Sequence, residues 1–161
     1  MAESSRRAAR PVAKGGLPNA LFVVASAELV PEELVGLADD LTILFPWGSL
    51  LRGTLGLDEA AARGIAALVR PGGTVRAFVS VTDRDGPDLP RLDDAATAER
   101  LAEGWSRHGL RVVSFCRASA DEVAATHSTW ARRLAAGTIR PAWRIALASD
   151  EALEEAVADA I

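Results

Sequence analysis

Residues 41–53 read LTILFPWGSLLRG, and this stretch decides how the rest of the chain is organised. The five residues before Pro46 are apolar or β-branched and carry no charge, which is typical of a central strand buried on both faces. Pro46 ends the strand, Gly48 frees the backbone, and Ser49 can cap a new helix. Trp47 is therefore predicted on a loop at the carboxyl end of the strand, where open α/β sheets bind their ligands.

The length and composition predict one globular domain with its own core, because 49% of the 161 residues are hydrophobic and 25% are charged. No window is as long and apolar as a membrane span, and residues 1–16 lack the apolar centre of a signal peptide, so we expect a cytoplasmic protein without membrane contact. The single Cys116 lies in an apolar run and is expected to be buried and chemically inert. His108 and His127 match no metal-site spacing, and we expect no metal.

The net charge is −4, but the cations are segregated along the chain. A basic N-terminal arm contains Arg6, Arg7, Arg10 and Lys14. A second group contains Arg132, Arg133, Arg140 and Arg144. Such clusters favour contact with a polyanion, although a disordered solubilising tail explains the arm about equally well.

Apolar periodicity predicts a three-layer α/β fold with five strands. The strands are expected at 20–25, 41–45, 74–81, 110–115 and 143–148. Helices or helical turns are expected at 31–38, 49–54, 58–70, 94–108, 120–125 and 130–136, with a terminal helix from residue 150. Residues 71–73 are expected as the turn between the helix at 58–70 and the strand at 74–81. Periodicity alone does not separate a methyltransferase-type sheet from other doubly wound sheets.

Four tryptophans divide by their setting in the sequence. Trp105 lies on the apolar face of a predicted helix and Trp143 begins a strand, so both are expected in the core. Trp47 and Trp130 lie beside Gly, Ser and Thr in predicted loops or at a helix start. They either pack at the rim of the core or form an aromatic pair for a planar ligand such as a flipped nucleobase; spacing alone slightly favours rim packing.

Four segments carry a resemblance to a known family. They read KGGLPN at 14–19, ASAE at 25–28, FPWGSLLRG at 45–53 and STWARRL at 128–134. In this order and at these separations they closely resemble the bacterial 16S rRNA adenine-1408 N1 methyltransferases that confer aminoglycoside resistance. The resemblance covers essentially the whole chain and implies a class I methyltransferase (Rossmann-like) α/β fold that uses S-adenosylmethionine (SAM). It also implies a monomer that acts on 16S rRNA in the small ribosomal subunit.

The resemblance also implies roles for individual residues. Trp47 and Trp130 would sandwich the flipped adenine. The residues expected beside the cofactor are Ala27, Glu28, Pro46, Ser49 and Ser128. The residues expected to grip rRNA phosphates are Arg10, Lys14, Arg132, Arg133 and Arg140. Adenine N1 is unprotonated at neutral pH, so such a site mainly has to flip, stack and align the base.

One departure from the family pattern concerns the first β-α-β unit, whose Gly-rich loop wraps the methionine end of the cofactor. We find no such unit before residue 20, and therefore expect a single 1–161 domain with a basic arm and turn at 1–19 and a truncated α/β core at 20–161. On this view residues 1–161 alone would bind SAM weakly and fold poorly, because strands 20–25 and 41–45 would lack neighbours. The alternative function is a non-catalytic remnant that binds rRNA or a partner. A small-molecule methyltransferase is disfavoured by the Arg clusters.

Overall fold

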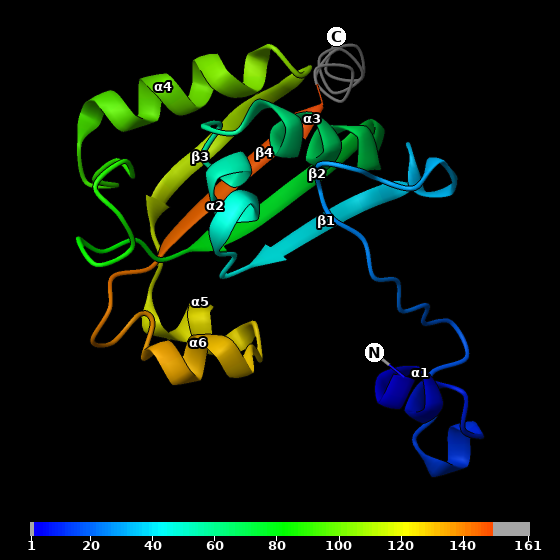
Figure 1. Ribbon diagram of the computed structural model, residues 1–161. Helices are drawn as coiled ribbons and strands as arrows, with labels where there is room; N and C mark the ends of the chain where they lie inside the picture. Colours follow the sequence, from blue (N-terminus) through cyan, green and yellow to red (C-terminus); the bar gives the residue numbers. More distant parts are fainter. Residues whose placement is uncertain (1, 150–161) are drawn as a thin grey trace, which may run out of the picture.

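The computed structural model describes residues 2–149, which contain one mixed sheet of four strands in the order β1-β2-β4-β3 (Figure 1). The strands are β1 (Ala38–Leu44), β2 (Val69–Val79), β3 (Leu110–Arg117) and β4 (Trp143–Ser149). β1 is parallel to β2, whereas β4 runs antiparallel to both β2 and β3. The α/β class expected from the sequence is confirmed.

The helices predicted at 49–54, 58–70, 94–108, 120–125 and 130–136 are present within two residues of those bounds. The one expected at 31–38 is only a short 3-10 helix, and the helices at 2–8 and 12–14 were not predicted. In chain order the helices are α1 (Ala2–Ala8), η1 (Val12–Lys14), η2 (Glu32–Leu34), α2 (Gly48–Thr54), α3 (Glu59–Leu68), α4 (Ala95–Ser106), α5 (Ala120–Ala125) and α6 (Thr129–Leu134). The helix expected from residue 150 lies outside the described residues. Within residues 2–149, none of the helices has the length and apolar character that crossing a membrane requires.

Side-chain caps explain why two of these helices begin where they do. Asp58 accepts a hydrogen bond from the Ala61 amide at the start of α3. Ser119 and Glu122 form a reciprocal capping box at the start of α5. Each cap satisfies a backbone N–H that has no partner inside its helix, which is why these starts could be predicted locally.

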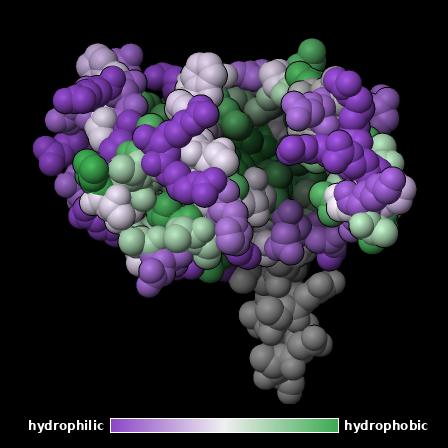
Figure 2. All heavy atoms as spheres, turned by 90° about the horizontal axis from the view of Figure 1, so that it is seen from below, coloured by the Kyte–Doolittle hydropathy of each residue, from purple (hydrophilic) through white to green (hydrophobic). Residues whose placement is uncertain are grey.

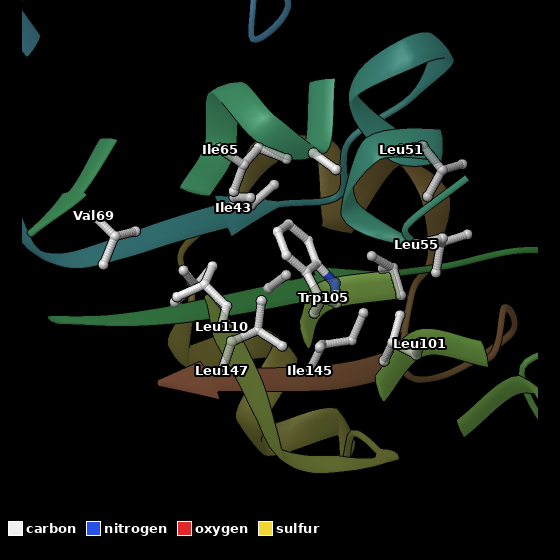
Figure 3. Packing of buried hydrophobic residues seen from close by; sticks show 14 of the residues in the cluster. Ile43, Leu51, Leu55, Ile65, Val69, Leu101, Trp105, Leu110, Ile145 and Leu147 are labelled. Atoms are coloured by element: carbon white, nitrogen blue, oxygen red, sulfur yellow. The ribbon is translucent and has the colours of Figure 1, made fainter. Parts of the chain in front are cut away.

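The main core lies between the sheet and α2, α3 and α4, which cover one face (Figures 1 and 3). Trp105 of α4 is fully buried there, and its indole N–H donates to the Thr54 carbonyl at 3.3 Å. Trp143 is half-buried and its ring stacks on Phe115 with centroids 4.9 Å apart. Cys116 is half-buried rather than buried, because its strand position faces the side of the sheet opposite these three helices.

A smaller cluster lies at the carboxyl ends of β1 and β2, where α5 and α6 pack (Figure 1). Phe45 and Phe78 supply its aromatic rings, 6.3 Å apart between centroids. The remaining buried members are Ala118, Val123, Ala131, Ala136 and Ala142. This cluster connects the end of β1 with the helix that carries Trp130.

Two predicted features of the sheet are wrong. The apolar segment 20–25 forms no strand: its residues are exposed, with Leu21 at 81% and Val24 at 78%, since no strand among residues 2–149 pairs with it. β1 is an edge strand instead of a central one, and only Ile43 of its seven residues is buried. A strand's place in a sheet depends on its hydrogen-bonded neighbours, which its own sequence does not encode.

Residues 71–73 also differ from expectation, because they lie inside β2 instead of forming a turn before it. They accommodate a register shift against β1, where Ala38 pairs with Val69 but Asp40 pairs with Thr74. The extra residues therefore form a bulge at the start of the strand. In Figure 1, α1 and η1 lie apart from the sheet, and the division into an arm at 1–19 and a core at 20–161 stays a prediction.

Candidate functional site

Trp47 and Trp130 line the same pocket, although they are far apart in the sequence. The pocket has a volume of about 970 Å³ and opens at the carboxyl end of β1. Its other lining residues are Leu44, Phe45, Pro46, Gly48, Ser49 and Leu50. Trp47 is 79% exposed and Trp130 is 44% exposed, so both indoles have open surface for a ligand.

The backbone at Phe45 explains how Trp47 reaches this pocket. Phe45 is a non-glycine residue with φ at 49°, a conformation that turns the chain sharply after β1 and stores roughly 1–3 kcal/mol of strain. Its N–H donates to the Phe78 carbonyl at 2.7 Å, and its buried side chain keeps the turn in place. Trp47 then occupies the position just before α2, with its side chain left in solvent.

Trp130 is the second residue of α6, and the cap and buried contacts of that helix hold it in place. Ser128 caps α6 by accepting a hydrogen bond from the Ala131 amide. Ala131 is buried in the same cluster as Phe45. Phe45 therefore supports the loop of one tryptophan and the helix of the other.

The ASAE segment reaches the start of α2 through Glu28. The pKa of Glu28 lies below its usual value, chiefly because of the Ser49 hydroxyl beside its carboxylate. The Glu28 backbone and Ser26 act in the same direction, and burial opposes them. Ala27 lines an adjoining, mostly apolar pocket of about 320 Å³, whose lining shares Leu44 and Leu50 with the tryptophan pocket. The structure thus places three predicted cofactor residues, Ala27, Pro46 and Ser49, in the linings of two neighbouring pockets, and Glu28 lies beside Ser49.

Ser128, the fifth predicted cofactor residue, lines a different pocket. That pocket of about 590 Å³ lies against α5 and α6 and includes His127 and Arg132. The hydroxyl oxygen of Ser128 accepts the hydrogen bond that caps α6. Ser128 precedes Trp130 by two residues. Its contact with a cofactor stays a prediction.

The predicted rRNA-contacting residues fall into two settings. Arg10, Lys14, Arg132 and Arg133 are exposed, whereas Arg140 is partly buried in an ion pair with Asp85. Figure 2 shows a hollow with hydrophobic side chains at its floor between two hydrophilic sides. By their places in Figure 1, the N-terminal arm forms one side and the α5–α6 region the other.

Sequence reasoning missed two residues of this region. Phe45 belongs to the quoted motif, but its strained φ follows from the packing of Phe78 against it. Asp85 lies in an acidic loop, and its arginine partner comes 55 residues later. Among residues 2–149, no group of three His, Cys, Asp or Glu side chains could hold a metal ion.

Known proteins resemble this chain in sequence over most of its length. The family described as "NpmA: 16S rRNA (adenine(1408)-N(1))-methyltransferase" matches residues 1–148. The 16S rRNA (adenine(1408)-N(1))-methyltransferase of Streptoalloteichus hindustanus is 37% identical over 141 residues, which cover 81% of this chain and 62% of that protein. The enzyme of the same description from Escherichia coli is 30% identical over 148 residues, which cover 88% of this chain and 68% of that protein. This chain thus spans about three fifths of the length of the first relative.

Solved structures give the same match. The antibiotic-resistance methyltransferase Kmr superposes with a TM-score of 0.74 at 32% identity, covering 92% of this chain and 70% of that one. The W203A mutant of the 16S rRNA (adenine(1408)-N(1))-methyltransferase from Catenulisporales acidiphilia, solved with its cosubstrate SAM, superposes with a TM-score of 0.79 at 29% identity. The superposition covers 92% of this chain and 70% of the mutant enzyme's chain. The four-stranded sheet therefore has the fold of the class I methyltransferases.

Proposed function

Because this chain belongs to the 16S rRNA (adenine(1408)-N(1))-methyltransferase family, we propose that the protein transfers a methyl group from SAM to N1 of the decoding-site adenine in 16S rRNA. The observation that carries the proposal is the pocket shared by Trp47 and Trp130. Two exposed indoles from distant segments suit the two faces of one planar base.

The tryptophans would do most of the work on the substrate. An adenine at this position has to leave its stack before its N1 edge is accessible, and stacking on aromatic side chains compensates the lost base stacking. N1 carries its own lone pair at neutral pH, so the site needs no general base to start the reaction. Alignment of N1 by Trp47 and Trp130 is then the main catalytic contribution of this chain.

The pocket beside the tryptophans has the properties that an adenosyl group requires. Ala27, Val30 and Leu50 offer an apolar wall, and Glu28, whose pKa is lowered, follows Ala27 directly in the chain. A carboxylate there can accept a hydrogen bond from an exocyclic amine. SAM supplies an electrophilic methyl group on a sulfonium ion when bound. Pro46 and Ser49 line the tryptophan pocket between Leu44 and Leu50, the two residues that both pockets share, and would separate the donor from the target base. Ser128 would lie further along the α6 side.

Docking on the small ribosomal subunit would rest on cations at the sides of the hollow. Arg10 and Lys14 lie on the N-terminal arm, and Arg132 and Arg133 lie on α6. Folded RNA is recognised largely by its shape and phosphates, which exposed arginines contact well. We further propose that the protein acts as a monomer in the cytoplasm, where the small subunit is found.

A second candidate function is rRNA binding without methyl transfer. It is favoured by the exposed, unpaired segment 20–25 and by the edge position of β1, since both leave apolar surface beside the adenosyl pocket without cover among residues 2–149. A methyl-transfer assay on small ribosomal subunits separates the two functions.

The test is methyl transfer to purified small ribosomal subunits by the intact protein, with SAM labelled in its methyl group. We expect label in 16S rRNA and a reverse-transcription stop at adenine 1408, because a methyl group on N1 blocks Watson–Crick pairing. Subunit binding without incorporation would support the second function instead. Neither binding nor incorporation would contradict both.

A charge reversal on α6 tests the docking surface. Arg133→Glu should weaken binding to the small subunit and lower the salt slope of log Kd by about one, because one phosphate contact is lost. Arg63→Glu on α3 is the matched control, since Arg63 is also exposed but lies on a helix that covers the sheet elsewhere. Binding measured by filter retention at several salt concentrations gives the slope. An Arg133→Glu slope equal to that of the control would show that Arg133 is merely solvated.

A further inference from the structure

One ion pair joins the loop after β2 to the turn after α6. The Arg140 Nη2 lies 2.6 Å from the Asp85 Oδ2, with side-chain exposures of 24% and 29%. Of the arginine–carboxylate pairs recorded for residues 2–149, this pair is the least exposed. The Thr82 amide and hydroxyl both donate to the same carboxylate oxygen at 2.7 Å. Such a constrained geometry distinguishes it from the usual flexible surface pair.

The carboxylate is ionised in this setting. Burial raises the pKa of Asp85, but the hydrogen bonds from Thr82 and the charge of Arg140 lower it by more, so the net pKa lies below its usual value. A charged acceptor holds a guanidinium more firmly than a neutral one would, and two Thr82 donors fix the carboxylate oxygen that Arg140 contacts. Arg140 therefore has a fixed anchor on the β2 side.

Arg140 is in turn part of the hydrogen-bonded unit that contains α6. Its amide donates to the carbonyl of Ala135, the residue with φ at 49° that ends the helix, at 3.1 Å. Its carbonyl accepts from the Gly137 amide at 2.8 Å. Trp130 lies at the opposite end of the same unit. A shift of Arg140 is thus passed on to Trp130 through a short helix and a closed turn.

The apolar contacts of this unit are few. Ala131, Ala136 and Ala142 supply most of its small buried side chains, which lie in the cluster around Phe45 and Phe78. Alanines bury little apolar area, and each contributes correspondingly little to holding the helix in one place. One further polar contact, from the Ser80 hydroxyl to the Pro141 carbonyl at 2.7 Å, acts next to Arg140.

We propose that Asp85 is a positioning residue, which holds Arg140 and thereby sets the position of Trp130 relative to Trp47. The expected effect of Asp85 on methyl transfer rests on the proposed function, whereas its effect on the position of α6 does not. It assigns to the Asp85–Arg140 pair the alignment of the target base, in place of direct phosphate contact by Arg140.

The catalytic test uses Asp85→Asn, which keeps the size of the side chain and removes its charge. In the intact protein we expect the methyl-transfer rate constant on small subunits to fall by up to about 10²-fold, as misplacement of an aligning group does, with Kd and its salt slope unchanged. Arg140→Asp alone should act likewise, and the exchange Asp85→Arg with Arg140→Asp should restore part of the rate. Asp88→Asn, an exposed acid in the same loop, is the matched control and should leave the rate unchanged. Equal rates for Asp85→Asn and the control, or an Arg140→Asp variant that changes only Kd and the salt slope, would overturn the proposal.

A second measurement does not depend on methyl transfer. Nitroxide labels at Arg63→Cys on α3 and Arg133→Cys on α6, in a Cys116→Ser background, report the distance between the sheet-bound helices and α6 by pulsed electron paramagnetic resonance. We expect one narrow distribution that broadens or shifts with Asp85→Asn and stays narrow with Asp88→Asn. An unchanged distribution with Asp85→Asn would overturn the proposal. If the protein transfers no methyl group, the proposed function fails while this measurement still decides the role of the ion pair.

Discussion

Replacing Trp47 or Trp130 with alanine should lower methyl transfer by about 10²-fold or more in the intact protein. Base stacking of roughly 1–3 kcal/mol is lost with either indole, and the alignment of adenine N1 is lost with it. The two indoles line one pocket, so the double variant should lose less than the product of the two single losses. The rate constant is measured in single turnover with excess protein over small subunits.

Three controls accompany these variants. Trp47 and Trp130 are 79% and 44% exposed, so the alanine variants should keep the melting temperature of the parent protein. SAM affinity should stay close to that of the parent, because the adenosyl pocket is lined by other residues. Trp47→Phe should retain more activity than Trp47→Ala, since a smaller ring still stacks. Parent rates in both alanine variants would refute the aromatic sandwich.

The largest expected effect on stability belongs to a different tryptophan. Trp105→Ala should lower the free energy of unfolding by roughly 3–5 kcal/mol, because it leaves a cavity at the centre of the main core (Figure 3). The Thr54 carbonyl also loses the indole N–H that donates to it. For a small domain this is a large part of the total stability, which is typically about 5–15 kcal/mol.

Urea unfolding followed by circular dichroism measures this loss, with Trp130→Ala as the control at an exposed site. Trp105→Phe should recover part of the stability, because it refills much of the cavity. A Trp105→Ala variant that unfolds at the same urea concentration as the Trp130→Ala variant would contradict the assignment of Trp105 to the core.

Local signals in the sequence were sufficient for most element boundaries. Asp58 and Ser119 begin their helices by bonding amides three residues later, and Pro46 comes two residues after β1 ends at Leu44. Each of these effects involves residues within one turn of each other, so the sequence alone contains the whole interaction. The same holds for the amphipathic α4, which buries Leu101 and Trp105 one turn apart.

Local signals did not predict which strands pair with one another in the sheet. Segment 20–25 has the composition of a strand but remains exposed, and β1 has the apolar run of a central strand but occupies an edge. A run of β-branched and apolar residues reports only the tendency to be extended and buried. Which strands bond to it depends on segments elsewhere in the chain.

The sequence by itself determined the starts of helices with side-chain caps, the division of the tryptophans into core and loop, and the motif by which the family can be recognised. Only the tertiary structure decided that Trp47 and Trp130 share a pocket, that Glu28 meets Ser49, and that Arg140 is bound to Asp85. Caps and periodicity arise within a turn of helix or strand, where backbone geometry sets every distance. Contacts between distant segments depend on how β1, β2 and α6 pack around Phe45 and Phe78, and that packing exists only in the folded chain.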